Sequence, residues 1–338
     1  MTALPAPRPI REYVGVDRVR FREEIRPAGQ PAVLRGLGGD WPAVAAGRSG
    51  PEAIVAYLKA CKPTRRVGAI VGPPEIEGRF FYRDDLRALN FSRGEANLPD
   101  VLDRLLRDAG EPRPFAMAVQ SETIATLLPG FIEANATDLV APTVEPRIWI
   151  GNAIRVAPHY DLKENIGVVV AGRRRFTVFP PDQLANLYPG PFELTPAGTP
   201  VSMVDLAHPD LDRHPRFAEA MATAQSAELA PGDAIYLPFQ WWHGVDSLDP
   251  VSVFVNYWWT EDDGAFGNAY GALVHALLTL KPLPAEQRAA WRRMFDHYVF
   301  ADEDAGAHLP PHARGMIGPL SPELRARLKA TLNALLGE

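Results

Sequence analysis

The chain has 338 residues, of which 46% are hydrophobic and 22% are charged, and its formal net charge is −6. This balance excludes a disordered chain, because enough apolar surface is present to fill a core. The acidic charge argues against a nucleic-acid partner, and no apolar run approaches the roughly 20 residues that cross a membrane.

The start of the chain and its cysteine content indicate the compartment. Residues 1–11 contain three prolines and no apolar stretch, so we expect no signal peptide. Cys61 is the single cysteine, which excludes an intramolecular disulfide and a cysteine-rich metal site. These features predict a cytoplasmic protein with no membrane association.

Residues 1–140 have the pattern of an α/β segment. Short apolar runs bounded by proline and glycine predict strands within 31–37 and 66–72. Apolar residues at helical spacing predict helices at 51–60 and 99–108. We expect this segment to cover a β-rich core and to shape the mouth of any site within it.

Residues 141–262 form that predicted core, because the pattern changes to short runs of β-branched and aromatic residues. The runs lie at 148–150, 166–171, 176–179, 234–237 and 251–259. Turns rich in glycine and proline divide them, which favours an antiparallel barrel or sandwich over βαβ units. The expected fold is therefore mainly β with flanking helices, in the α+β class.

Residues 263–338 return to helical spacing. Apolar residues form one stripe within 270–278, a second within 291–299 and a third within 324–336. These helices could pack on their own barrel or form a dimerisation surface. Three amphipathic helices at a chain end exceed what a small barrel needs, so we expect a homodimer through the C-terminal helices.

Two of the histidines indicate a metal site. His159 and Asp161 are two residues apart, so in an extended segment their side chains point to the same face. His243 follows a later predicted strand, 234–237, that can end at the same barrel mouth. Two imidazoles and one carboxylate make the facial triad that holds Fe(II) and leaves coordination positions open. An isolated His-x-Asp tripeptide is a weak signal, and the later Trp-Trp-His segment strengthens it.

Several motifs in a fixed order resemble one family. The sequence from about Ile25 to Trp259 is similar to the cupin-like JmjC branch of 2-oxoglutarate-dependent oxygenases, to which the asparaginyl hydroxylase of hypoxia-inducible factor belongs. The motifs are His159-Tyr-Asp161, Asn165, Gly172–Pro181, Leu187-Tyr-Pro189, Pro231–Pro238, Trp241-Trp-His243 and Asn256-Tyr-Trp258. The resemblance implies a double-stranded β-helix, the jelly-roll barrel of cupins, holding Fe(II) through His159, Asp161 and His243.

The resemblance also implies 2-oxoglutarate as co-substrate, with a cation for its distal carboxylate. Arg174 stands where the family often has lysine, and a guanidinium can bind a carboxylate through two parallel hydrogen bonds. Val156 stands where the animal enzyme has a carboxylate-binding threonine, so one hydroxyl is missing. The alternative for Arg174 is a solvated hairpin turn, and Arg155 is a second candidate cation.

Asn165 and Asn256 match family positions near the co-substrate. Each amide offers an acceptor and two donors and could orient a carboxylate or a metal-bound water, or could be a satisfied buried amide.

The sequence therefore predicts an Fe(II)- and 2-oxoglutarate-dependent oxygenase, a hydroxylase acting on an unidentified protein side chain or small molecule. One alternative is a metal-binding cupin-like module, or a divergent oxygenase, that does not use 2-oxoglutarate. A cupin-type isomerase or dioxygenase is a weaker alternative, because such barrels commonly use more histidine ligands.

Overall fold

The computed structural model describes residues 4–260 and 269–336. The chain divides into two compact units, Met1–Trp259 and Thr260–Glu338. The predicted boundary at residue 140 falls inside the first unit, where contacts do not divide the chain. The predicted boundary at 262/263 lies outside the described residues.

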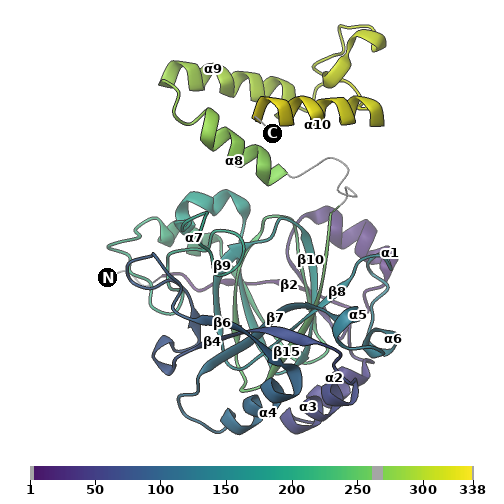
Figure 1. Ribbon diagram of the computed structural model, residues 1–338, viewed down its shortest axis with the longest axis vertical. Helices are drawn as coiled ribbons and strands as arrows, with labels where there is room; N and C mark the ends of the chain where they lie inside the picture. Colours follow the sequence, from purple (N-terminus) through teal and green to yellow (C-terminus); the bar gives the residue numbers. More distant parts are fainter. Residues whose placement is uncertain (1–3, 261–268, 337–338) are drawn as a thin grey trace. The chain divides into compact units, whose positions relative to one another are not determined.

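The first unit consists of two facing β-sheets (Figure 1). The six-stranded sheet has the order β1 (Arg8–Pro9), β12 (Gln225–Leu229), β11 (Arg174–Phe179), β14 (Trp242–Ser247), β9 (Arg155–Tyr160) and β5 (Arg79–Phe80). The nine-stranded sheet has the order β2 (Arg11–Val14), β3 (Ala32–Arg35), β13 (Ala234–Leu237), β10 (Glu164–Ala171), β15 (Ser252–Trp259), β8 (Pro146–Gly151), β7 (Ala116–Thr123), β4 (Arg66–Gly72) and β6 (Ser92–Asn97). The predicted cupin fold, mainly β with flanking helices, is confirmed.

Alternation along the strands separates two apolar layers. On β10, Val168 and Val170 face away from the other sheet, whereas Val169 belongs to the interior between the sheets. That interior also contains Phe176 of β11 and Phe254 of β15. Successive side chains of a strand point to opposite faces, so buried apolar residues on both faces give the near-continuous runs seen in the sequence.

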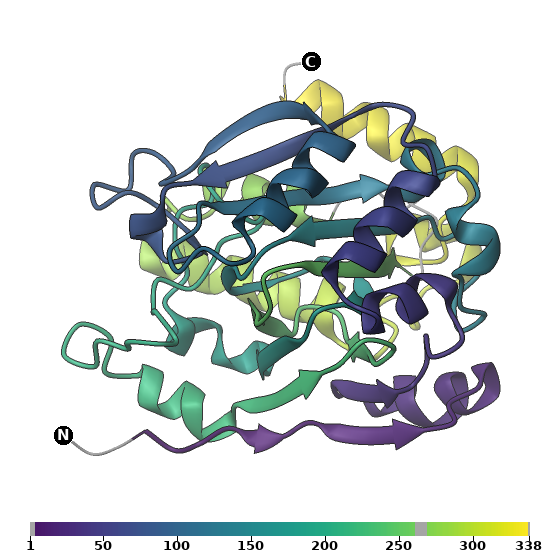
Figure 2. The same cartoon turned by 90° about the horizontal axis from the view of Figure 1, so that it is seen from below.

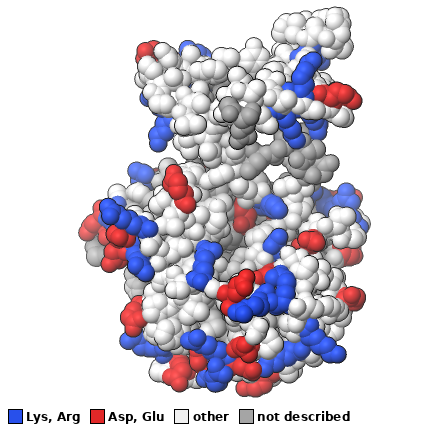
Figure 3. Space-filling view, viewed as in Figure 1, with Lys and Arg blue, Asp and Glu red and all other residues white. Residues whose placement is uncertain are grey.

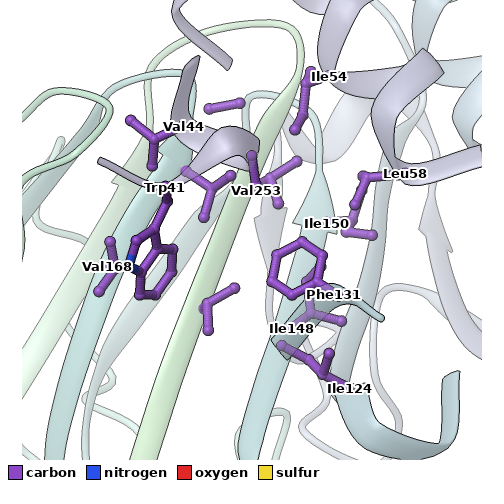
Figure 4. Packing of buried hydrophobic residues seen from close by; sticks show 14 of the residues in the cluster. Trp41, Val44, Ile54, Leu58, Ile124, Phe131, Ile148, Ile150, Val168 and Val253 are labelled. Carbon is purple, nitrogen blue, oxygen red and sulfur yellow. The ribbon is translucent and has the colours of Figure 1, made fainter. Parts of the chain in front are cut away.

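Helices cover the outer face of the nine-stranded sheet (Figure 2). They are α2 (Pro42–Arg48), α3 (Pro51–Ala60), α4 (Leu98–Asp108), α5 (Ile124–Leu127) and α6 (Phe131–Ala134), while α1 (Arg18–Arg20) and α7 (Phe217–Thr223) are short helices elsewhere in this unit. Ile54 and Leu58 project from α3 toward Ile150 of β8 (Figure 4). The predicted helices at 51–60 and 99–108 are confirmed, and this layer anchors the sheet that carries one wall of the site.

The N-terminal segment completes both sheets. β3 pairs antiparallel with β13, and β2 pairs parallel with β3. β7 pairs with β8, β4 with β7, and β6 with β4. Added strands satisfy the backbone groups that a bare barrel edge would expose. The segment therefore extends the cavity wall as well as covering it.

The second unit contains three α-helices among its described residues, α8 (Ala269–Thr279), α9 (Ala285–Phe295) and α10 (Pro322–Leu336). They coincide with the three predicted stripes. None of their described side chains is buried; Leu278 is 71% exposed and Leu335 is 78% exposed. Within residues 4–260 and 269–336, every helix is too short or too polar to span a bilayer.

Candidate metal centre and cavity

Two neighbouring strands of the six-stranded sheet carry the histidines. His159 on β9 lies opposite His243 on β14, and their ring centroids are 4.3 Å apart. Asp161 follows the last residue of β9. One ligand atom from each of these three side chains lies within 4.8 Å of the other two. The structure thus brings together the three residues that the sequence proposed as metal ligands.

Backbone carbonyls orient both imidazoles. Nδ1 of His159 lies 3.0 Å from the carbonyl oxygen of Ala157, and Nδ1 of His243 lies 3.0 Å from that of Trp241. A carbonyl only accepts hydrogen bonds, so each Nδ1 carries the proton and each Nε2 keeps its lone pair. Burial, and then the neighbouring His243, lowers the pKa of His159 to about 4. His159 is therefore neutral at physiological pH, which is the form that binds metals.

A chain of hydrogen bonds holds Asp161. Its Oδ2 accepts from Trp258 Nε1 at 2.9 Å and from Asn165 Nδ2 at 3.2 Å. Asn165 Oδ1 accepts from Asn256 Nδ2 at 3.1 Å, and Asn256 Oδ1 accepts from Trp149 Nε1 at 2.8 Å. The two asparagines thus form a relay that orients the carboxylate. This arrangement matches the interpretation of both asparagines as satisfied buried amides, and their hydrogen bonds orient the carboxylate of Asp161.

The triad lies on the wall of a cavity of about 510 Å³ between the two sheets. Strands of the barrel and of the N-terminal segment both line it, as does the loop 195–198. The described charged side chains in the lining are Asp161, Arg93 and Arg174. The cavity is large enough for a metal and small organic molecules together.

Arg174 is a buried member of the cavity lining. It is 8% exposed, donates from Nε to Ser252 Oγ at 3.0 Å, and stacks over the ring of Phe254 at 4.6 Å. No acidic group pairs with it among residues 4–260 and 269–336. Burial alone lowers its pKa to about 9, so the guanidinium is still charged at neutral pH. A buried cation without a counterion is costly, which indicates an anion-binding site.

The neighbours of Arg174 show why its position is special. Arg173 pairs with Asp249 at 3.0 Å, and Arg175 pairs with Glu228 at 3.4 Å, both on the solvent side. The solvated-turn alternative therefore describes these two arginines and is wrong for Arg174. Alternation along β11 places Arg174 on the same face as Phe176, which is a signal that the sequence already contained.

Arg155 does not reach the cavity. Its Nη1 lies 3.5 Å from Asp205 Oδ1, and its Nε donates to the carbonyl oxygen of Glu77. The register between β9 and β14 shifts beyond His243, and this bulge turns Val156 rather than Arg155 toward the interior. The expectation of a second cation at Arg155 is corrected accordingly.

The sequence interpretation missed several residues of the cavity. Ser252 and Phe254 were missed. They lie on β15 at steps of two from the expected Asn256, and they contribute to one wall or its hydrogen bonds. Their common face could have been found from strand alternation once Asn256 was suspected. Gln120 could not have been found, because its position depends on pairing of β7 within the larger sheet.

Two facing sheets that enclose a site of two histidines and one carboxylate define a cupin-type metal-binding barrel. The chain belongs to the cupin-like domain family, whose model matches residues 18–265. The family predicted from the sequence motifs is thereby confirmed.

Curated relatives carry several names. The HSPB1-associated protein 1 homolog of Danio rerio is 30% identical over 250 residues, 68% of this chain and 51% of that protein. Lysine-specific demethylase JMJ31 of Arabidopsis thaliana is 33% identical over 132 residues, 39% of this chain and 22% of the relative. The tRNA wybutosine-synthesizing protein 5 of Gallus gallus is 25% identical over 312 residues, 82% of this chain and 90% of that protein. This chain spans about half or less of the first two relatives' length.

Proposed function

We propose that this protein is an Fe(II)- and 2-oxoglutarate-dependent oxygenase that hydroxylates a protein side chain or a small molecule. One observation carries the proposal: the buried guanidinium of Arg174, which has no acidic partner among the described residues, shares a cavity with a two-histidine, one-carboxylate triad. The triad has the donor set that Fe(II) oxygenases use, and the cation suits a dicarboxylate co-substrate.

The donor atoms of the site fit Fe(II). His159 and His243 would offer Nε2, because their Nδ1 atoms are hydrogen-bonded to backbone carbonyls. Asp161 would offer a carboxylate oxygen, because the hydrogen bond from Asn165 engages only Oδ2. When bound, Fe(II) and 2-oxoglutarate supply oxygen activation coupled to loss of carbon dioxide from the co-substrate. Asn165 and Trp258 keep Asp161 aimed at the metal, and neutral His159 needs no proton loss before binding it.

Arg174 would bind the distal carboxylate of 2-oxoglutarate. Its Nε is held by Ser252, so its two Nη groups can form parallel hydrogen bonds with a carboxylate. Phe254 and Phe176 make the surrounding wall apolar, which excludes water and strengthens that ion pair.

A module that binds metal without 2-oxoglutarate is the second candidate, and Val156 favours it. Val156 lines the cavity and offers no hydroxyl to a carboxylate. The test is a titration of Zn(II)-loaded protein with 2-oxoglutarate, together with succinate release from the Fe(II)-loaded protein. Saturable binding with succinate release supports the oxygenase; no binding at millimolar 2-oxoglutarate supports the module.

The substrate class rests on charge. Acidic and basic side chains are interspersed over the face seen in Figure 3, and the chain carries a net negative charge. Phosphate backbones bind best to continuous basic surfaces, so a protein or small molecule is favoured over nucleic acid. The tRNA-related name belongs to the relative, and a filter-binding assay with total tRNA at two salt concentrations tests the choice.

The C-terminal helices support a homodimer. Leu277 and Leu278 of α8, Trp291 of α9 and Leu335 of α10 are all at least 36% exposed, and these helices bury none of their described side chains. Large exposed apolar surfaces mark protein interfaces. A second copy would bury this surface, which sedimentation of the full chain can test. We also propose a cytoplasmic location, supported by the single cysteine and testable by cell fractionation.

A further inference from the structure

Where strand β7 lines the cavity, an irregularity in its pairing lies next to a polar side chain, Gln120. The pairing of β7 with β8 runs from Val119 opposite Ile150 to Glu122 opposite Ile148, so β7 contains one extra residue. Ser121, inside this bulge, has φ +55°, a conformation that residues with a side chain rarely adopt. Backbone strain held in place beside a cavity commonly serves the site.

Contacts from β8 stabilise the bulge. Arg147 Nη1 donates to the carbonyl oxygen of Ser121 at 2.9 Å and lies 3.3 Å from its Oγ. Before the bulge, Ala116 and Ala118 face the barrel side of β7, and Gln120 continues that alternation into the cavity lining. Strand alternation therefore presents the Gln120 amide to the cavity, and the bulge lies directly beside it.

The Gln120 amide has no hydrogen-bond partner within the described part of the chain, although the residue is half-buried. Its donor and acceptor are consequently available to a molecule in the cavity. Arg93, on edge strand β6, lines the same region and lacks an acidic partner among the described residues. Its guanidinium lies 5.5 Å from the ring of Phe91, which keeps it near the wall.

The charges of the loaded site indicate what this region selects. Asp161 is the only carboxylate among the described lining residues, and it belongs to the metal site. In the loaded site the charges of Fe(II), Asp161, 2-oxoglutarate and Arg174 would cancel, which leaves Arg93 as the uncompensated charge among the described lining residues. A cationic substrate group would meet repulsion and no counterion, and such mismatches are strong determinants of specificity.

We infer, on the basis of the proposed function, that Gln120 and Arg93 form the substrate subsite and select a carboxamide or carboxylate group over a lysine-type cation. Gln120 binds the polar head of the substrate, and Arg93 sets the sign of the charge that the mouth accepts. The Ser121 bulge acts as a positioning element for Gln120. Trp149 and Trp258 also line the cavity, and a methylated ammonium group could bind them by cation–π contact. This contact would oppose the selection against cations that we infer.

The test uses full-length protein loaded with Mn(II) and 2-oxoglutarate, because Mn(II) broadens the proton resonances of molecules that approach it. Four probes are compared: the N-acetyl amides of asparagine, aspartate, lysine and trimethyllysine. We expect at least tenfold greater broadening for the asparagine and aspartate probes than for either lysine probe. In Gln120→Glu, the lysine probe should gain at least tenfold and the aspartate probe should lose at least tenfold.

Matched controls separate local from general charge effects. Gln183→Glu makes the same change outside the cavity and should behave as the wild type. Arg93→Gln should weaken the aspartate probe selectively, whereas Arg113→Gln, at an exposed position outside the lining, should not. Three results would overturn the inference. A lysine probe could be broadened as much as the asparagine and aspartate probes in the wild type, the ranking of the probes could stay the same in Gln120→Glu, or no probe could be broadened at all.

Failure of the proposed function has a separate signature. Water-proton relaxation reports Mn(II) binding, and the methylene protons of 2-oxoglutarate report the co-substrate in the same samples. Loss of either signal would overturn the oxygenase assignment and the inference that rests on it. Normal loading with the wrong probe order would overturn the inference alone.

Discussion

Replacing Arg174 with methionine should raise the free energy of unfolding of the protein without 2-oxoglutarate. The same change should abolish the stabilisation that 2-oxoglutarate gives to the wild type. Arg174 is buried, no acidic side chain in the described part of the chain pairs with it, and burial lowers its pKa to about 9. A depression of this size corresponds to roughly 5 kcal/mol against the charged form, an upper bound on what the folded state loses. Methionine fills much of the same volume without that cost, so the net gain should be about 1–3 kcal/mol.

The measurement is thermal unfolding with and without saturating 2-oxoglutarate, on Zn(II)-loaded protein. For a chain of this size, the gain corresponds to a Tm increase of about 2–6 °C in the empty variant. Ligand at about 100 times its Kd should stabilise the wild type by roughly 2.7 kcal/mol and should leave the variant unchanged. The loss of two charge-assisted hydrogen bonds, worth about 1.5–3 kcal/mol each, accounts for a decrease in affinity of at least about 150-fold. The same ligand concentration then adds less than about 0.3 kcal/mol to the variant.

The pH dependence gives the result a definite sign. The folded-state pKa of Arg174 is depressed, so its cost is fully present at neutral pH and is relieved as pH rises through about 9. The difference in free energy of unfolding between wild type and variant should therefore shrink as the pH rises above about 9. Arg113→Met, at an exposed position, is the control. A variant that is less stable when empty, or that still responds to 2-oxoglutarate, would refute the assignment of Arg174 as an anion site.

Three further predictions concern the metal, the relay and the C-terminal helices. His159→Ala or Asp161→Ala should reduce iron-dependent succinate release at least 1000-fold, and substantial turnover in a sample of known metal content would contradict the triad. Asn165→Leu should weaken metal binding about 10- to 100-fold, measured by competition with a chelator; unchanged affinity would remove the relay's positioning role. Trp291→Asp should convert the proposed dimer to a monomer in sedimentation without loss of metal binding, and an unchanged sedimentation coefficient would exclude α9 from the proposed interface.

The strands of the barrel differ in how well the sequence predicted them. β10, β13 and β15 were found, because they are buried on both faces and consist largely of β-branched and aromatic residues. β9 and β14, which carry the ligands, were not recognised as strands. Pro158 interrupts the first, and the second mixes Trp, His, Gly and Asp. Functional side chains replaced the apolar ones that make a strand detectable.

The amino-acid sequence alone determined the fold family and pointed to the three candidate metal ligands, because the motifs that carry both occur in a fixed order along the chain. The tertiary structure decided which cations face inward. A bulge turns Arg155 outward, strand pairing buries Arg174, and pairing of β7 within the larger sheet places Gln120 in the cavity lining beside a second bulge. Side-chain direction in a sheet reverses with each one-residue shift of register, and register is fixed only when strands distant in sequence pair.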